Sequence, residues 1–487
     1  MSKWTYHLQE TLLGNYNLIT DVITGQSMTL DEVFRRGYFY GKSLKLADQT
    51  ILPVLLPNSI EYLIVYIGAI TNGLIFAPIP YMLSGKEVQN ILLHYDSNFL
   101  ITDRVDTNSR VERPPRIATH ELNEDDTIKF TIKQPLDTDV SSLYYSSGTT
   151  GTPKGILYTY ENKFSLISSI VEDFRFTKST KHFVFLPFGH TAALNYSIFP
   201  SLFTGCNLLI ASGFEKVRSN FFNVLADHKV NYVQLVPTIA QTLIKLKVDV
   251  SDIDLSSLEF MGCGSAPLSK NVQIEFYETF KKQLANLYGL SETGPSHIDN
   301  PLSSDWEPGS IGVPLSVNEC KLAHDGEILL KGNNIMRGYY KNDELTREVI
   351  NDGWFHTGDY GYEHKGKYYF LDRKKDLIVI GGINVYPAEI ENVLYKDSRV
   401  MEASVFSVQD EVLGEKIVAY IKCTVRDHDS YMQTETDLIK LCKSNLSRFK
   451  IPAIIVFTDE MPKTASGKIL RRELKKLYLQ RYSKTEY

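Results

Sequence analysis

The chain has 487 residues, which is too long for one ordinary hydrophobic core and predicts two or three domains. Hydrophobic residues make up 43% and charged residues 23% of the sequence, a balance that is typical of folded globular proteins and excludes a disordered or fibrous chain. The formal net charge of −6 shows no basic excess, so we expect no nucleic-acid partner.

The five cysteines are scattered, and no two of them lie within four positions of each other. This spacing indicates neither a disulfide framework nor a zinc motif, and it suits a reducing compartment. The first twenty residues lack the uninterrupted apolar core of a secretory signal. We therefore expect a cytoplasmic protein.

Residues 62–85 carry no charge and are long enough to cross a bilayer. Asn72 and Gly73 interrupt this segment, however, and Pro78 and Pro80 follow. These breakers favour a buried helix, a glycine stop and a buried strand, so we expect no transmembrane segment.

Apolar runs typical of strands alternate along the chain with stretches typical of helices. The strand-like runs are residues 50–57, 182–188, 206–212 and 232–237, and the helix-like stretches are residues 161–174, 217–228 and 271–280. Such alternation predicts an α/β fold with largely parallel sheets. Residues 103–140 are polar and proline-containing, which indicates a solvated connection with some short strands.

The pattern changes near residue 376. A helix signal at 387–396, strand signals at 402–408 and 416–423 and a basic helical tail predict a second, smaller α+β domain. We therefore expect two domains, residues 1–375 and residues 376–487.

The segment "SSGTTGTPKG" (146–155) contains small, hydroxyl and basic residues but no large side chain. It follows a strand-like run, and a helix is expected downstream, so the segment occupies the position where α/β folds bind ligands. Glycines allow close approach to a phosphate, while hydroxyls and Lys154 neutralise its oxygens. The P-loop of NTPases is excluded because Gly155 follows Lys154. A mobile surface linker has the same composition, and the segment alone leaves both interpretations open.

Four further motifs follow in order: "NLYGLSETGP" (286–295), "GWFHTGDYGY" (353–362), "DRKKDLIVIGGINVYPAEIE" (372–391) and "PKTASGKILRREL" (462–474). Together with residues 146–155 they resemble the adenylate-forming superfamily of acyl- and aryl-CoA synthetases, luciferases and peptide-synthetase adenylation domains. The last two motifs look most like those of fatty-acyl and general acyl-CoA synthetases. The resemblance implies a large N-terminal domain of β-sheets layered with helices and a small mobile C-terminal α+β domain.

The resemblance also implies a two-step reaction. A carboxylate and ATP give an acyl-adenylate and pyrophosphate, and a thiol then displaces AMP. The first step brings anions together at a crowded phosphorus, so catalysis needs positioning, cationic side chains and a divalent metal such as Mg²⁺.

The resemblance assigns residues to the phosphates and the metal. Glu292 is expected to bind Mg²⁺, which prefers carboxylate oxygens, and Thr293 to bond the α-phosphate. The β- and γ-phosphates are expected to contact Ser146, Ser147, Gly148, Thr149, Thr150, Gly151, Thr152 and Lys154.

The adenosine moiety has its own expected contacts. Tyr288 is expected to stack on adenine, and the backbone of Gly264, Ser265 and Ala266 to line the slot for the base. Asp359 resembles the family residue that accepts both ribose hydroxyls, a task that suits a carboxylate. Arg373 is expected to reach the ribose or the phosphates.

Lys468, near the chain end, resembles the catalytic lysine that bridges the attacking carboxylate and the α-phosphate, for which a compact point charge is suited. If Lys468 serves the first step, it must leave before the thiol attacks, so the small domain is expected to swing. The resemblance implies a hinge at Lys375. Gly381 and Gly382 are expected to leave room for the pantetheine arm of CoA, or of a carrier protein.

The acid site is less defined by the sequence. No acidic residue lies in 188–196, which disfavours an unprotected α-amino acid as substrate. His190 matches a residue that lines the approach of the acid in acyl-CoA synthetases, although a structural role is the alternative. The apolar residues Leu194, Leu235, Val236 and Ile239 are expected to form an acyl pocket, or equally to be core.

Two classes of function therefore remain. The first is an ATP- and Mg²⁺-dependent acid–thiol ligase that uses a fatty or other acyl acid and CoA, with a carrier-protein acceptor or adenylation alone as variants. The second is a non-catalytic nucleotide-binding relative. The presence of Lys154, Glu292, Asp359, Arg373 and Lys468 together favours the enzyme.

Overall fold

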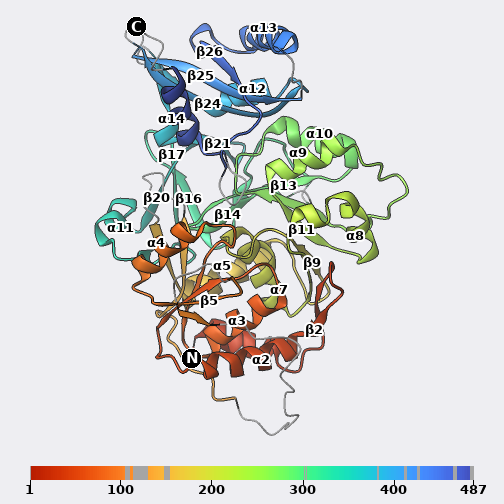
Figure 1. The fold of residues 1–487 in the computed structure, drawn as a ribbon, viewed down its shortest axis with the longest axis vertical. Helices are drawn as coiled ribbons and strands as arrows, with labels where there is room; N and C mark the ends of the chain where they lie inside the picture. The colour runs from red at the N-terminus through yellow and green to blue at the C-terminus, as the bar shows by residue number, and fades with distance from the viewer. Residues whose placement is uncertain are drawn as a thin grey trace.

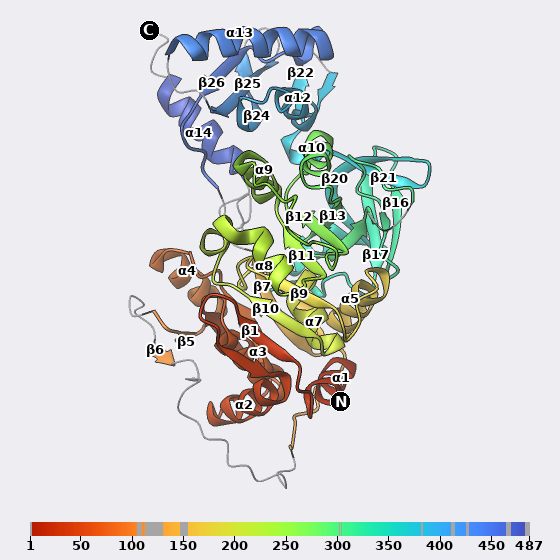
Figure 2. The same ribbon diagram turned by 90° about the vertical axis from the view of Figure 1, so that its right-hand side faces the viewer.

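The computed structural model (Figure 1) describes residues 2–104, 110–112, 130–146, 154–300, 302, 304–380, 383–410, 414–424, 428–463 and 469–482. The chain forms a large N-terminal domain of sheets and helices, and a smaller C-terminal domain lies beyond one end of it (Figures 1 and 2). This arrangement confirms the predicted fold class.

The first sheet consists, in spatial order, of β18 (Gly338–Tyr339), β8 (Lys154–Thr159), β7 (Val140–Ser146), β4 (Ile75–Pro78), β3 (Ile51–Leu55), β5 (Phe99–Thr102) and β6 (Arg110–Glu112). Strands β7, β4, β3, β5 and β6 run parallel, whereas β8 and β18 are antiparallel to their neighbours. The helices that precede or connect β3, β4 and β5 along the chain are α2 (Leu30–Ser43), α3 (Ile60–Thr71) and α4 (Gly85–Tyr95).

The uncharged segment 62–85 folds as predicted, with most of α3 followed by β4. Helix α3 is buried on almost every side, and it packs closely on α2 because both helices carry glycines at the contact. A Cβ atom at Gly41 would lie 2.2 Å from the carbonyl oxygen of Gly68. Among the described residues, no helix is both long and apolar enough to cross a membrane.

The second sheet consists, in spatial order, of β15 (Val313–Pro314), β14 (Gly294–Ile298), β13 (Leu284–Leu290), β12 (Phe260–Gly264), β11 (Tyr232–Leu235), β9 (Lys181–Val184), β10 (Asn207–Ile210), β1 (Leu18–Asp21) and β2 (Ser27–Thr29). The strands from β13 to β1 are parallel, as the sequence predicts. The helices of this region are α1 (Lys3–Leu12), α5 (Tyr160–Asp173), α6 (Thr191–Ala193), α7 (Phe199–Thr204), α8 (Phe221–Asp227), α9 (Pro237–Leu246) and α10 (Lys270–Phe280).

The third sheet is antiparallel, and the apolar runs of the sequence do not predict it. Its strands are β16 (Asn318–Leu322), β17 (Glu327–Gly332), β20 (Trp354–His364), β19 (Ile350–Asn351) and β21 (Lys367–Arg373), and α11 (Asp343–Val349) precedes β19. Strands β20 and β21 form a long hairpin in which Asp359 pairs with Arg373.

The C-terminal domain contains two small sheets. Their strands are β22 (Ile378–Ile380) and β23 (Ile383–Val385), then β24 (Val400–Asp410), β25 (Gly414–Cys423) and β26 (Ile454–Phe457). The helices are α12 (Pro387–Leu394), α13 (His428–Asn445) and α14 (Arg471–Tyr482). Its hydrophobic core begins at Ile378 and shares no residue with the core of the N-terminal domain. The division at residues 375 and 376 stays a prediction.

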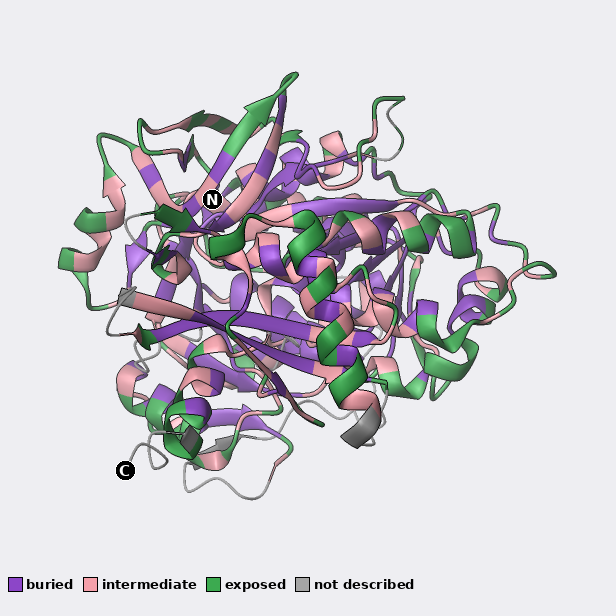
Figure 3. Ribbon diagram, turned by 90° about the horizontal axis from the view of Figure 1, so that it is seen from above, coloured by how far each residue is buried: buried purple, intermediate pink, exposed green. Residues whose placement is uncertain are grey.

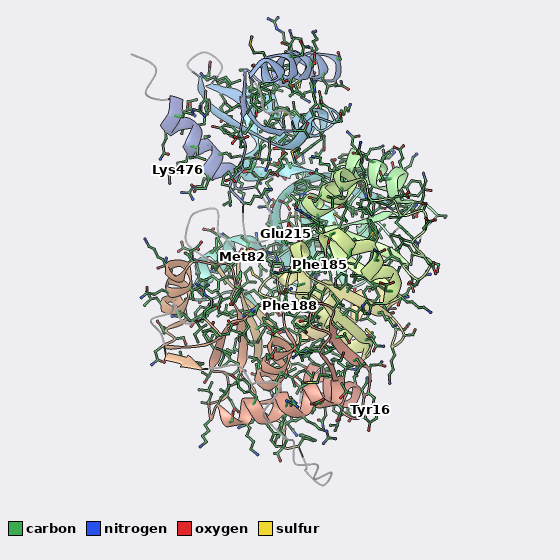
Figure 4. All side chains as sticks on the ribbon, turned by 45° about the vertical axis from the view of Figure 1, so that its right-hand side comes forward. Tyr16, Met82, Phe185, Phe188, Glu215 and Lys476 are labelled. Carbon is green, nitrogen blue, oxygen red and sulfur yellow. The ribbon has the colours of Figure 1, made fainter. Side chains whose placement is uncertain are left out.

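Large aromatic side chains dominate the N-terminal core. Phe185 and Phe188 are buried and lie inside that domain (Figure 4). Buried residues follow the strands of the sheets, while exposed residues lie mainly on the outer helices and loops (Figure 3). This distribution explains why the parallel strands read as continuous apolar runs in the sequence.

The helix expected downstream of the glycine-rich segment is present as α5, but the sequence pattern did not predict the strand that precedes it. The residues that follow the segment do not enter a helix directly, because β8 comes first and pairs antiparallel with β7. Ser146 pairs with Lys154, so the segment connects two antiparallel strands, and its residues 147–153 lie outside the described residues. The run "GILYT" has the apolar, β-branched composition of a strand, which the helical signal downstream obscured.

Candidate active site

A cavity of about 820 Å³ lies where the nine-stranded sheet, the β20–β21 hairpin and the C-terminal domain meet. Many residues of the predicted motifs line it together with residues of the C-terminal domain. Those central to the site are Ser265, Ala266, Tyr288, Asp359, Arg373, Ile469 and Arg471.

Asp359 is a buried acid of this cavity, with 2% of its surface exposed. Its carboxylate accepts a hydrogen bond of 2.9 Å from the Tyr288 hydroxyl, and Arg373 Nε lies 3.6 Å from its other oxygen. Burial, followed by the neighbouring Asp359 charge, raises the pKa of Tyr288 well above its usual value, so the phenol stays a donor. The three side chains come from three motifs and form one cluster.

The turn that carries Asp359 is shaped by Glu327, a residue that the sequence does not single out. The nearly buried Glu327 carboxylate accepts from the Gly358 N–H at 2.8 Å and from His356 at 3.2 Å. Gly358 has φ +69°, a left-handed conformation that suits glycine. A glutamate at the start of a strand matches no recognisable sequence motif, so the contact of Glu327 with this turn could not be predicted.

The predicted adenine wall follows directly after β12. A Cβ at Gly264 would lie 2.5 Å from the carbonyl oxygen of Leu287, so the strands can approach this closely only at a glycine. Ser265 has φ +68°, an uncommon conformation for a residue with a side chain. Ser265 and Ala266 line the cavity and leave space beside Tyr288.

Glu292 lies in the turn between β13 and β14. Its Oε1 accepts a hydrogen bond of 2.8 Å from the Tyr339 hydroxyl. Among the described residues, no donor lies within hydrogen-bonding distance of its second oxygen. A partly exposed carboxylate with one uncommitted oxygen has the chemistry that Mg²⁺ requires. No group of three or more acidic, histidine or cysteine side chains in the described part of the chain could hold a metal by itself.

Thr293 stabilises the same turn. Its buried hydroxyl donates to the carbonyl of Gly294 at 2.7 Å and accepts from the N–H of Leu290 at 3.1 Å. An α-phosphate could engage this hydroxyl only in place of the Gly294 carbonyl. The contact of Thr293 with the phosphate stays a prediction.

Lys154 opens β8, and its Nζ lies 5.2 Å from the centre of the Tyr339 ring. Ser146, at the end of β7, is described by its backbone alone. The remaining phosphate-loop residues, and three predicted residues of the C-terminal domain, lie outside the described residues. They are Ser147, Gly148, Thr149, Thr150, Gly151, Thr152, Gly381, Gly382 and Lys468.

The predicted hinge residue Lys375 lies in a 3₁₀ turn, Lys374–Asp376, between β21 and β22. Burial lowers its pKa, and the nearby Arg373 lowers it further. The end of β21 is tied to α14 by Arg471, which the sequence motif contains but does not mark as special. Arg471 forms ion pairs with Glu391 at 2.8 Å, Asp376 at 3.0 Å and Asp372 at 3.6 Å.

The predicted acid-side residues lie in the N-terminal domain, and none of them lines the cavity described above. His190 caps α6 by accepting from the Ala192 N–H, and burial lowers its pKa to about 4, so its imidazole is neutral at pH 7. The apolar residues belong to the hydrophobic core or pack against it. They are Leu194, Leu235, Val236 and Ile239.

The fold and the convergence of these motifs define a two-domain nucleotide-binding protein. The sequence matches the family of AMP-binding enzymes over residues 20–340 and the AMP-binding enzyme C-terminal domain over residues 389–468. The chain belongs to this family, and the resemblance seen in the sequence is confirmed. Its curated relatives are named CoA ligases or synthetases, so we assign the chain to the AMP-forming acid–thiol ligases.

Three relatives illustrate the range of acids. A long-chain-fatty-acid–CoA ligase of Bacillus subtilis is 34% identical, with 69% of this chain and 61% of that ligase aligned. A 2-succinylbenzoate–CoA ligase of Geobacillus is 33% identical over 77% of this chain and 76% of its own length. A feruloyl-CoA synthase of Amycolatopsis is 30% identical over 93% and 94%.

Solved structures agree with this assignment. The o-succinylbenzoate CoA synthetase of Bacillus subtilis, in complex with its acyl-adenylate intermediate, is 26% identical with a TM-score of 0.84, and 98% of each chain is covered. ATP-bound MatB of Rhodopseudomonas palustris is 23% identical with a TM-score of 0.87, covering 99% of this chain and 100% of that chain, and shows the same fold.

Proposed function

We propose that this protein activates a carboxylic acid with ATP and transfers the acyl group from the acyl-adenylate to CoA. One observation carries the proposal. A single cavity is lined by the Tyr288–Asp359–Arg373 cluster and also by Ile469 and Arg471, which follow the predicted catalytic Lys468 in the chain. Residues of these four motifs thus line one cavity, which supports a shared nucleotide site.

In the first step the chain's own residues position ATP. Asp359 would accept the ribose hydroxyls, and Tyr288 would lie against adenine beside the Ser265–Ala266 backbone. Lys154 would neutralise the β- and γ-phosphates. Glu292 would hold Mg²⁺ through its uncommitted oxygen, and the metal would supply neutralisation of phosphate charge. Lys468 would bridge the carboxylate and the α-phosphate.

In the second step a thiol must reach the acyl carbonyl. Lys375 lies in a short turn between two strands, where a change of a few backbone dihedrals would rotate the small domain. Lys468 would then leave the site, and Gly381 and Gly382 would face it and leave room for the pantetheine arm. The acceptor that we propose is CoA, because the curated relatives are CoA ligases.

For the acid we propose a fatty or other acyl acid. No acidic residue lies in 188–196, and the neutral imidazole of His190 places no charge next to an apolar chain. The relatives act by name on fatty, aryl and dicarboxylic acids, so the choice among acids rests on this absence of charge near His190.

The test is acid-dependent exchange of radioactive pyrophosphate into ATP over short, medium and long fatty acids, aryl acids and α-amino acids. We expect exchange with apolar acids, none with α-amino acids, and AMP release that CoA accelerates more than a phosphopantetheinyl carrier protein does. Absence of exchange with every acid would contradict the proposal, and faster release with the carrier protein would overturn the choice of CoA.

The role of Lys468 has a separate test. Lys468→Ala is expected to lower the adenylation rate by orders of magnitude while ATP affinity stays nearly unchanged, because the lysine acts on the transition state. Single-turnover adenylate formation and calorimetric ATP binding measure the two quantities. An unchanged rate would refute this role.

A further inference from the structure

Tyr339 lies between two residues that belong to different motifs. Its hydroxyl donates to Glu292 Oε1 at 2.8 Å, and its ring centre lies 5.2 Å from Lys154 Nζ. One side chain thus contacts both the carboxylate proposed for the metal and the lysine proposed for the phosphates. The sequence gives no signal for this role, since Tyr339 lies outside the five motifs.

The backbone around Tyr339 fixes where its ring can lie. Strand β18 is paired to β8 by bonds from the Tyr340 N–H to Gly155 at 2.7 Å and from the Arg337 N–H to Leu157 at 2.8 Å. The Tyr339 N–H also donates to Thr346 Oγ1 at 2.9 Å. With 5% of its surface exposed, the side chain is held in place by its surroundings.

The turn that carries Glu292 is tied to the same segment. The Met336 N–H donates to the Glu292 carbonyl at 2.9 Å, and the Asn334 amide donates to the Thr293 carbonyl at 2.8 Å. The carboxylate and the phenol therefore belong to one connected unit. Their hydrogen bond does not depend on the position of the C-terminal domain.

The separation of the two charges matters for their function. Among the described residues, Lys154 and Glu292 form no ion pair within 4.0 Å. A direct pair would neutralise both groups and leave neither available for a phosphate or a metal. The face of the Tyr339 ring contacts the ammonium, and its hydroxyl donates to the carboxylate. Within the part of the chain that the structure describes, the second carboxylate oxygen has no donor. Burial, followed by the Glu292 charge, raises the pKa of Tyr339, so the phenol remains a donor.

We propose that Tyr339 is a positioning residue that aims Glu292 at the divalent metal and keeps it apart from Lys154. This inference rests on the proposed function, because it takes Glu292 and Lys154 as ligands of metal and phosphate. The hydroxyl should therefore affect only the metal-dependent binding of ATP, because it contacts Glu292. The ring should also affect binding without metal, because it contacts Lys154.

The experiment is calorimetric titration of the full-length protein with ATP, in Mg²⁺ and in EDTA, without any acid, so that no turnover contributes. Tyr339→Phe is expected to weaken ATP binding in Mg²⁺ by about tenfold, the effect of losing one hydrogen bond to a charged group, and to leave binding in EDTA unchanged. Tyr339→Leu, which also removes the ring, is expected to weaken binding in EDTA as well.

The matched control is Tyr158→Phe. The Tyr158 hydroxyl is buried beside the same turn, but it donates to the carbonyl of Ser291 at 2.9 Å and not to the Glu292 carboxylate. Tyr158→Phe is expected to keep the wild-type ratio of affinities in Mg²⁺ and EDTA. Equal ratios for Tyr339→Phe and Tyr158→Phe would overturn the proposal.

Two further results keep the proposal separate from folding and from the proposed function. If circular dichroism shows that Tyr339→Phe does not fold, Glu292→Asp replaces it, because the shorter side chain cannot reach the phenol. This variant should lose about tenfold in ATP affinity in Mg²⁺ and none in EDTA. An unchanged affinity in Mg²⁺ would overturn the proposal. If the wild type binds ATP equally in Mg²⁺ and EDTA, the metal role of Glu292 fails, and this inference falls with it. Pyrophosphate exchange by the wild type tests the proposed function independently.

Discussion

At the scale of single residues, Asp359 joins two motifs through side-chain contacts. It accepts from Tyr288 and faces Arg373, so its negative charge is balanced inside the cavity. A carboxylate has two acceptor oxygens, which matches the two hydroxyls of a vicinal diol. The sequence supplies the identity of these residues through their motifs, and the β20–β21 register brings Asp359 opposite Arg373.

Asp359→Asn is therefore expected to weaken ATP binding by at least tenfold, because the amide keeps one acceptor but loses the charge that strengthens both bonds. Calorimetric titration with ATP measures this loss. Inorganic tripolyphosphate has no ribose and serves as the comparison ligand, whose affinity should stay the same. A parallel loss for both ligands would show that the residue acts on the phosphates or on the fold.

Single residues are also where sequence reasoning missed most. Glu327, Tyr339 and Arg471 act on the site through hydrogen bonds to other residues. Glu327 and Tyr339 lie outside the five motifs, and the motif that contains Arg471 does not mark this residue as special. Motifs identify residues that touch a ligand. The side chains that orient them become visible only when distant strands are paired.

At the scale of elements, the turn before Asp359 depends on a contact between strands. Glu327, on β17, accepts from the Gly358 N–H at 2.8 Å and also lies 3.5 Å from Lys374 Nζ, beside the predicted hinge. One carboxylate thus holds the ribose turn of β20 and the end of β21. Its removal should loosen the turn without touching a ligand directly.

Glu327→Gln is expected to raise the Kd for ATP several-fold, since an amide accepts a weaker hydrogen bond from Gly358 than a carboxylate does. Asp325→Asn is the matched control, because Asp325 contacts the same Lys374 at 2.9 Å but not the turn. Equilibrium ATP binding of both variants decides the matter. Equal affinities in the two variants would contradict a role of Glu327 in shaping the turn.

Elements differed in how well the sequence predicted them. Helix α3 and the parallel strands were predictable because full burial makes them continuous apolar runs. The antiparallel sheet was not, because strands such as β16 alternate half-buried and exposed residues, and β20 carries a register shift at Tyr360 and Gly361. Strand β8 was missed because a strong helix signal begins directly after it.

At the scale of the whole molecule, a network of charges connects the hinge to the last helix. Arg471 binds Glu391, Asp376 and Asp372, and Asp372 also accepts from the Ala388 N–H at the start of α12 at 2.7 Å. The change of pattern near residue 376 predicts two domains. It does not predict that three carboxylates share one cation, because these acids lie far from Arg471 along the chain.

Arg471→Gln is expected to destabilise the C-terminal domain by about 3 kcal/mol, since it leaves Glu391 and Asp372 without their cation. This value is the lower end for buried pairs, because 21% of the arginine side chain is exposed. Lys476→Gln, on the same helix (Figure 4), removes only an exposed contact to Glu473 and should cost less than about 0.5 kcal/mol. Urea unfolding measures both; similar losses would refute the network's role.

Acid sensitivity of the whole fold has a separate origin in buried histidines. His182 packs between Phe176 and Tyr232 in the N-terminal core, and neither ring nitrogen has a hydrogen-bond partner among the described residues. Burial lowers its pKa to about 3. Because of this lowered pKa, the unfolded chain binds a proton at a pH where His182 stays neutral in the folded chain. The contribution of His182 to the free energy of unfolding is therefore complete above pH 6.5 and falls as the pH drops toward 3.

His182→Phe is expected to remove this contribution to acid sensitivity, because phenylalanine keeps the ring contacts and cannot bind a proton. Between pH 7 and pH 5 this one histidine should lower the free energy of unfolding of the wild type by about 2 kcal/mol. The decrease in the variant should be smaller by the same amount. Urea unfolding at both pH values gives the comparison, with the exposed His324→Gln as the control that should follow the wild type. An equal loss of unfolding free energy in His182→Phe and the wild type would contradict this prediction. It would mean that the imidazole of the wild type is protonated inside the core. Such a cation would then need stabilisation other than hydrogen bonding among these aromatic rings.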